Sequence, residues 1–105
     1  MTPILVMVTV PSAAVGKKLG KKLVKERLAA CVQVVPGLTS IYRWEGKIET
    51  SKEHLLLLKS ADELWPSLQA AVRENHPYDC PEIVAVPPGQ VSKKYAAWWR
   101  EALGY

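Results

Sequence analysis

Apolar and polar residues alternate along this chain with two different periods, and the change of period marks its elements. Residues 4–11 (ILVMVTVP) are continuously apolar and end at a proline, which is typical of a central strand covered on both faces. Helical spacing follows at Val15, Leu19, Leu23 and Leu28. Ser12 can cap this helix, which is expected to run to about Ala30. Gly16 and Gly20 lower helix propensity, so they indicate close packing or a nearby ligand.

A long, bent β-hairpin is predicted in the middle of the chain. Its segments are residues 30–35 and 38–44 in the outgoing arm, 45–47 in the turn and 47–60 in the returning arm. Pro36 and Gly37 interrupt the outgoing arm and predict a bulge or kink. A domain of this size cannot cover such a hairpin, whose far end carries Tyr42, Trp44 and Ile48. Because exposure of these side chains is unfavourable, we expect self-association through sheet edges, with these three residues in the interface.

The second helix has an unusual predicted start. Ser60 and Glu63 have the spacing of a capping box, in which each side chain caps a backbone N–H of the other residue. Pro66 would then lie too deep in the helix, so the cap is instead expected at Asp62, with an irregular first turn. The helix is expected to end near Asn75, because the next residue precedes a proline and avoids the α region.

The order of the predicted elements indicates the fold class. A fourth strand over residues 82–86 and a terminal helix over residues 91–103 give the order β-α-β-β-α-β-α. This is an α+β fold with the split βαβ arrangement of a ferredoxin-like sandwich, followed by one added helix. Residues 1–105 contain no repeat, linker or low-complexity tract, so we expect a single domain.

Composition and charge narrow the classes of function. Much of the net charge of +4 comes from lysines between residues 17 and 25, without interleaved aromatic residues, so we expect a solvated helix face and no nucleic-acid partner. No apolar run approaches the roughly 20 residues that span a bilayer, and no export signal precedes the first strand. The two distant cysteines, Cys31 and Cys80, fit a reducing compartment. We therefore expect a cytoplasmic protein without a membrane partner.

Five segments together resemble the CutA family, the divalent-cation tolerance proteins. They are ERLAACV (26–32), SIYRWEGKIE (40–49), LLLLKS (55–60), HPYDCPEIVAVP (76–87) and YAAWW (95–99). The resemblance implies a homotrimer of ferredoxin-like subunits whose hairpin arms extend the sheets between subunits. It also implies a role in tolerance of copper and other divalent metals, without enzymatic activity or a required cofactor. The alternative is a sensor that binds small ligands in clefts between subunits, because the shape is similar to that of trimeric nitrogen-regulatory proteins.

Most positions of the family's recurring pattern are matched. They are Cys31, Tyr42, Trp44, Lys47, Glu49, Lys59, His76, Pro77, Tyr78, Pro81 and Glu82. Asp79 departs from the pattern, because many members have glutamate or glutamine there, and Cys80 stands where a small or β-branched residue is usual. Val8 stands near a position where some bacterial members have a cysteine suggested as a metal ligand, which argues against that metal route here.

The segment ENHPYDCPEI, residues 74–83, is the main candidate for chemistry. Its two prolines stiffen the backbone, so the segment can be a purely structural corner. Alternatively it binds metal, because copper prefers imidazole and thiolate ligands and a carboxylate can add to them. The metal-ligand candidates are His76, Asp79, Cys80 and Glu82. Successive side chains point in opposite directions, so one chain supplies too few ligands, and a second subunit or an exogenous ligand has to complete the site.

An anionic small ligand between subunits is the third interpretation. The residues considered for this cleft are Arg43, Lys47 and Lys59 for positive charge, Trp44 and Tyr78 for stacking, and Glu49 or Glu82 as counter-charge. Its structural alternative is a salt bridge between lysine and glutamate in the subunit contact. Catalysis is not expected, because the chain shows no serine, histidine and aspartate order of a triad and no glycine-rich phosphate loop.

Overall fold

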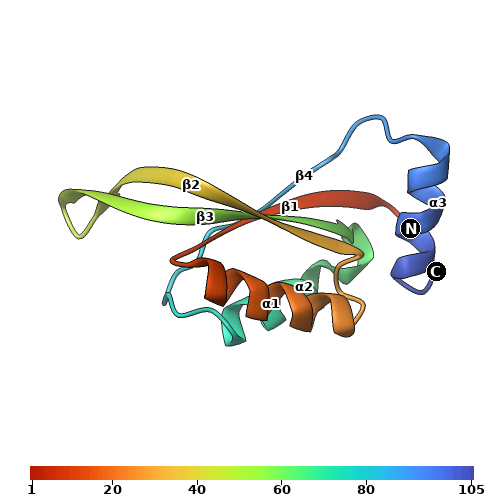
Figure 1. The fold of residues 1–105 in the computed structure, drawn as a ribbon, viewed down its shortest axis with the longest axis horizontal. Helices are drawn as coiled ribbons and strands as arrows, with labels where there is room; N and C mark the ends of the chain where they lie inside the picture. Colours follow the sequence, from red (N-terminus) through yellow and green to blue (C-terminus); the bar gives the residue numbers. More distant parts are fainter.

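The computed structural model describes residues 1–105, which form a four-stranded antiparallel sheet and three α-helices (Figure 1). In chain order the elements are β1 (Pro3–Val10), α1 (Ala13–Lys25), β2 (Cys31–Trp44), β3 (Lys47–Ala61), α2 (Trp65–Glu74), β4 (Ile83–Val86) and α3 (Lys93–Ala102). The strand order is β2-β3-β1-β4, so β1 is a central strand as predicted. The α+β class and the order of elements are confirmed. None of the helices is both long and apolar enough to cross a membrane.

Only one face of the sheet is covered by helices. α1 and α2 lie against the same face, and α3 lies at one end of the sheet beside the N-terminus (Figure 1). Alternate residues of β1, from Ile4 to Val10, are buried in the core, whereas Leu5 and Met7 between them stay partly exposed. The expectation that β1 is covered on both faces is therefore wrong for this chain alone, because no helix lies over the second face.

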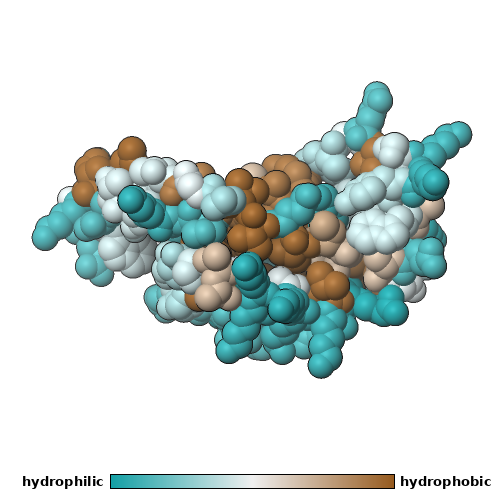
Figure 2. Space-filling model, in the orientation of Figure 1, coloured by the Kyte–Doolittle hydropathy of each residue, from teal (hydrophilic) through white to brown (hydrophobic).

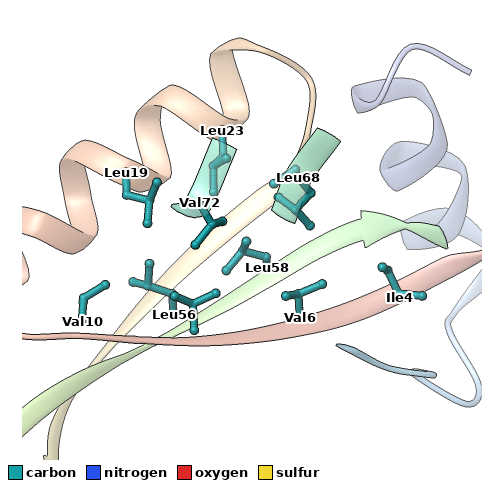
Figure 3. Close-up of a cluster of buried hydrophobic side chains, with 11 residues drawn as sticks. Ile4, Val6, Val10, Leu19, Leu23, Leu56, Leu58, Leu68 and Val72 are labelled. Carbon is teal, nitrogen blue, oxygen red and sulfur yellow. The ribbon is translucent and has the colours of Figure 1, made fainter. Parts of the chain in front are cut away.

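The main core lies between the sheet and helices α1 and α2 (Figure 3). Leu56 and Leu58 of β3 are fully buried there, among side chains from β1, α1 and α2. The two glycines of α1 allow the helix to approach the sheet closely. A Cβ on Gly16 would lie 3.0 Å from Cδ2 of Leu56, and one on Gly20 would lie 3.0 Å from Cγ1 of Val32. Close packing therefore accounts for both glycines.

Helix α1 begins as predicted and ends earlier than predicted. The Oγ of Ser12 accepts a hydrogen bond from the backbone N–H of Val15 at 3.2 Å, which confirms the cap. The helix stops at Lys25 rather than near Ala30. Arg27 adopts a left-handed conformation with φ of 58°, which ends the helical path and directs the chain toward β2.

The capping box that the spacing of Ser60 and Glu63 suggests, and that Pro66 argues against, does not form. Ser60 Oγ donates a hydrogen bond to the backbone carbonyl of Leu28 at 2.7 Å, and Glu63 Oε1 accepts one from the backbone N–H of Thr2 at 3.0 Å. A 3-10 turn over Asp62–Leu64 precedes α2, which confirms the irregular first turn. No side chain caps this turn or α2, so the cap expected at Asp62 is wrong. The end of α2 lies where the sequence predicts.

Strands β2 and β3 form the predicted long hairpin. A register shift between Val35 and Leu38 marks the bulge at the proline–glycine pair. Glu45 and Gly46 connect the strands with φ values of 50° and 78°, and two positive values are what a tight two-residue hairpin turn requires. The far end of the hairpin projects beyond the helices (Figure 1), and the molecule is 44 Å long.

Candidate functional site

His76 fixes the segment after α2 against β1. Its Nε2 lies 2.8 Å from the carbonyl oxygen of Thr9, and its Nδ1 accepts a hydrogen bond from the backbone N–H of Tyr78 at 3.0 Å. Because Nδ1 is an acceptor, the ring proton is assigned to Nε2, which donates it to Thr9. Both ring nitrogens are therefore used within the chain, and a metal ion could bind either one only by displacing a hydrogen bond.

Tyr78 connects the same segment to β3. Its ring contacts that of His76, with ring centroids 4.7 Å apart, and its hydroxyl donates a hydrogen bond to Oε2 of Glu53 at 2.9 Å. Glu53 is only 6% exposed, so this carboxylate lies inside the protein. Burial, together with the hydrogen bond to Glu53 and its negative charge, raises the pKa of Tyr78 to about 12. The phenol therefore keeps its proton, and continues to donate, throughout the neutral range.

A cavity of about 550 Å³ lies where this segment meets the hairpin, and we call it the hairpin cavity. Its lining comes from β1, β2, β3 and the segment before β4, and consists of Thr9, Ser40, Ile41, Tyr42, Trp44, Glu53, Tyr78, Asp79, Cys80 and Glu82. Small-molecule sites typically enclose about 300–1,000 Å³. The hairpin cavity is thus large enough for a small organic molecule and much larger than one ion needs.

The charges around the hairpin cavity are all negative. Glu53, Asp79 and Glu82 contribute carboxylates, and no lysine or arginine belongs to the lining. Of the residues predicted for an anionic ligand, Trp44, Tyr78 and Glu82 line the cavity, whereas Arg43, Lys47, Glu49 and Lys59 do not. Lys59 instead hydrogen-bonds to Gln33 farther along the sheet. The cleft predicted for an anion therefore does not assemble in one chain, because its cations lie elsewhere on the strands.

The predicted metal ligands are brought together only in part. Asp79, Cys80 and Glu82 line the hairpin cavity, and Cys80 is an exposed free thiol. However, no three histidine, cysteine or carboxylate side chains of the chain lie close enough together to hold a metal ion. His76 is also committed to its two hydrogen bonds. The four predicted ligands therefore do not form a metal site within one chain.

Glu53 is the central residue of the site that the sequence did not reveal. It lies among polar residues of the returning hairpin arm, where a glutamate is ordinarily solvated. The one available signal is its place directly before the apolar run HLLLL, at the boundary between the hairpin and the core. Its burial depends on Tyr78, which lies 25 residues away in sequence and covers it only in the folded chain.

The far end of the hairpin carries four exposed large apolar side chains, of which only Ile48 lies outside the cavity lining. Ile41 and Ile48 are 71% and 67% exposed, and Tyr42 and Trp44 are 42% and 47% exposed. Figure 2 shows apolar side chains at the far end of the hairpin, away from the charged side chains below the body of the molecule. The three residues predicted for a subunit interface are thus available to a partner in the single chain.

Comparison with known proteins places this geometry in a family. A family model described as "CutA1 divalent ion tolerance protein" matches residues 4–102. The chain is 50% identical over 99 residues to "Divalent-cation tolerance protein CutA" of Thermus thermophilus, covering 94% of this chain and 96% of that protein. It is 46% identical to "Protein CutA, chloroplastic" of Arabidopsis thaliana, again over 94% of this chain but only 54% of that protein. The chain therefore spans about half the length of the plant relative.

Solved structures agree with the sequence matches. The structure described as "Divalent cation tolerance protein (Cut A1)" from Thermus thermophilus superimposes with a TM-score of 0.94 at 48% identity. The match covers 98% of this chain and 100% of that one. The whole chain, including the projecting hairpin and α3, thus follows the architecture of that relative.

Proposed function

This chain belongs to the CutA1 divalent ion tolerance protein family, and from that premise we propose that it acts in divalent-cation tolerance without catalysis. In this proposal it works as a cytoplasmic homotrimer and binds copper or another divalent cation at the hairpin cavity. In this proposal the cation is cargo rather than a resident cofactor. The proposal rests mainly on one observation: the lining of the cavity combines three carboxylates and a free thiol with no cationic side chain.

The donor groups fit a borderline or soft cation. Cys80 can supply a thiolate, which copper favours, and Asp79 and Glu82 can supply oxygen ligands beside it. His76 is not included, because its two nitrogens already hold the segment in place. The local charge also favours a cation over the anionic ligand of the alternative function, since no lysine or arginine lines the cavity.

Assembly would supply what one chain lacks. The hairpin cavity is bordered by the exposed side chains of Tyr42 and Trp44, so a second copy packed against the hairpin would lie beside the cavity. The exposed Ile41 and Ile48 add apolar area for such a contact. Three copies are the assembly that the resemblance implies. Groups of a neighbouring copy could then complete the incomplete ligand set.

A ferredoxin-like fold is part of the same proposal. Its two βαβ units are β1-α1-β2 and β3-α2-β4, and the strand order β2-β3-β1-β4 interleaves them in one antiparallel sheet. The two crossover helices lie on one face and leave the other face open (Figure 1). Leu5 and Met7 on this open face add to the apolar area that the trimer would bury.

Copper titration of matched cysteine variants tests this function. We expect Cys80→Ser to weaken copper binding roughly tenfold or more, because it removes the soft ligand. Cys31→Ser is the matched control, since that thiol lies outside the cavity. Isothermal titration calorimetry measures each affinity. Equal affinities of the wild type and Cys80→Ser would refute copper binding at this site.

A further inference from the structure

We propose that the inner part of the hairpin cavity binds a small organic cation, namely an ammonium group carried on an apolar or aromatic body. Glu53, Tyr42, Trp44 and Tyr78 would contact this ligand. The proposal concerns a different ligand from the metal cation above, and it does not depend on the metal proposal.

The first reason is a largely buried carboxylate that has no cationic partner within the chain. Glu53 is 6% exposed, and the hydroxyl of Tyr78 is its one side-chain hydrogen-bond donor, directed at Oε2. No lysine, arginine or histidine forms a salt bridge with it. One oxygen of Glu53 accepts the bond from Tyr78, and the other is not among the buried atoms that lack a partner, so a ligand in the cavity can reach it. A donor that also carries positive charge makes the stronger hydrogen bond to a carboxylate. A ligand ammonium group would supply both the hydrogen bond and the charge.

The second reason is the aromatic lining next to this carboxylate. Tyr42, Trp44 and Tyr78 all line the cavity together with Glu53. Aromatic ring faces attract ammonium groups, and the attraction strengthens where water is excluded. Tyr42 is held in place by a hydrogen bond between its hydroxyl and that of Ser51 at 2.9 Å. A carboxylate surrounded by aromatic side chains is the chemistry that recognises an organic cation.

The third reason is the size of the cavity. At about 550 Å³ it could hold an ion together with an organic body, and five of its ten lining residues are hydrophobic. A bare metal ion would leave most of this volume filled with water and the aromatic side chains unused. A primary ammonium is favoured over a quaternary one, because only N–H groups can donate to Glu53.

A cationic side chain of a neighbouring copy is the competing occupant. In an assembled protein, a lysine or arginine of a second subunit could pair with Glu53 and fill the cavity. In that case no free amine would bind, and removal of the Glu53 charge would weaken assembly. The experiment below distinguishes these two outcomes.

Three probes of similar shape test the proposal on the assembled wild-type protein. They are phenethylamine, 2-phenylethanol and 3-phenylpropionate, which carry a positive, a neutral and a negative polar end. We expect phenethylamine to bind at least roughly tenfold more tightly than the alcohol, because a charge-assisted hydrogen bond adds to cation–π attraction. The acid should not bind. Equal binding of amine and alcohol, or no binding of the amine, would overturn the proposal without any variant.

Two glutamate variants then locate the site. Glu53→Gln keeps the size of the side chain and removes its charge, so phenethylamine binding should fall roughly tenfold or more. Glu49→Gln is the matched control, because this residue lies on the same strand outside the cavity lining and should bind the amine like the wild type. Unchanged amine affinity in Glu53→Gln overturns the assignment to this carboxylate. Light scattering of both variants shows whether assembly depends on Glu53 instead, which would assign the cavity to a neighbouring subunit.

A cysteine variant keeps this proposal separate from the metal proposal. Cys80→Ser should change phenethylamine affinity much less than copper affinity, because the thiol lines the cavity but carries neither the charge nor an aromatic face for the ammonium group. Loss of copper binding with retained amine binding would support both proposals. Retained copper binding with a loss of amine binding would contradict both proposals. It would show that the thiol binds the organic ligand and not the metal.

Discussion

The two halves of the hairpin have the same backbone pairing but very different surroundings. Near the core, Leu56 and Leu58 of β3 are fully buried beneath α1 and α2. Farther out, residues 41–50 are all exposed, although β2 and β3 continue to pair there. Strand pairing alone therefore extends the sheet, whereas burial requires a covering element on at least one face. The first half is stabilised within the chain, and the second half has no covering element in the single chain.

The hairpin cavity lies at the boundary between these halves. Along β3, side chains change from exposed at residue 50 to buried at Glu53 and then to the core leucines. At such a boundary a polar group can be mostly buried and still be reached by a ligand, as a binding site requires. The contrast predicts that core substitutions mainly change folding, hairpin substitutions mainly change assembly, and boundary substitutions mainly change binding and pH dependence.

The largest effect on the folding of the single chain is expected in the covered half. Leu58→Ala removes a fully buried side chain from the main core, so it should lower the free energy of unfolding by about 2–5 kcal/mol. Chemical denaturation followed by tryptophan fluorescence measures this change. Ile48→Ala is the control in the exposed half, where a subunit isolated by dilution should lose little stability. A cost below about 1 kcal/mol for Leu58→Ala would show that this region is not the core of the fold.

The next effect concerns assembly in the uncovered half. Trp44 is 47% exposed in the single chain, so truncation of this side chain should remove subunit contacts more than intrachain contacts. Trp44→Ala should therefore weaken the trimer, with a total cost of about 3–5 kcal/mol if the tryptophan is buried on assembly. Sedimentation at several protein concentrations measures the association. Trp98→Ala is a useful control, because that exposed tryptophan lies on α3 rather than on the hairpin. An intact trimer in Trp44→Ala, with unchanged melting temperature, would contradict this interface.

The same contrast explains which features the sequence predicted. The elements of the core half were predicted correctly, because apolar periodicity and the Ser12 cap are local sequence signals. The proline–glycine bulge was predicted for the same reason. The hairpin was predicted from the length of its two β-patterned segments and from the turn residues between them. Two local features were not predicted: the early end of α1, which precedes the left-handed Arg27, and the absence of a side-chain cap at Asp62. Both depend on how the chain crosses to the next element.

The site was less predictable than the fold. Sequence patterns identified Tyr78, Cys80 and Trp44, since these types stand out near prolines and at a hairpin end. They could not show that His76 uses both nitrogens internally, or that the expected cations lie outside the cavity. Glu53 was missed because its burial arises from a contact with a distant segment. Residue type thus predicted candidate site residues. Only the tertiary structure showed which of the charged residues line the cavity, and that these are all carboxylates.

The smallest effect is a change in the pH dependence of stability at the boundary. Folding raises the pKa of Tyr78 from about 10 to about 12, through burial first and then through the hydrogen bond to Glu53 and its charge. Folding therefore favours the protonated phenol. This contribution to stability is complete below pH 10 and is lost as the pH rises toward 12. Tyr78→Phe should flatten the fall of the unfolding free energy across this interval, as measured by denaturant titrations at closely spaced pH values.

The Glu53 carboxylate gives this prediction a sharper form. Glu53→Gln removes the negative charge but retains burial, so the pKa of Tyr78 should fall only part of the way toward its usual value. Phenolate absorbance during an alkaline titration of the folded protein would show one tyrosine titrating earlier in the variant than in the wild type. If Glu53→Gln left that titration unchanged, the carboxylate would not be acting on Tyr78. The boundary between the two halves would then lack the electrostatic coupling between Glu53 and Tyr78.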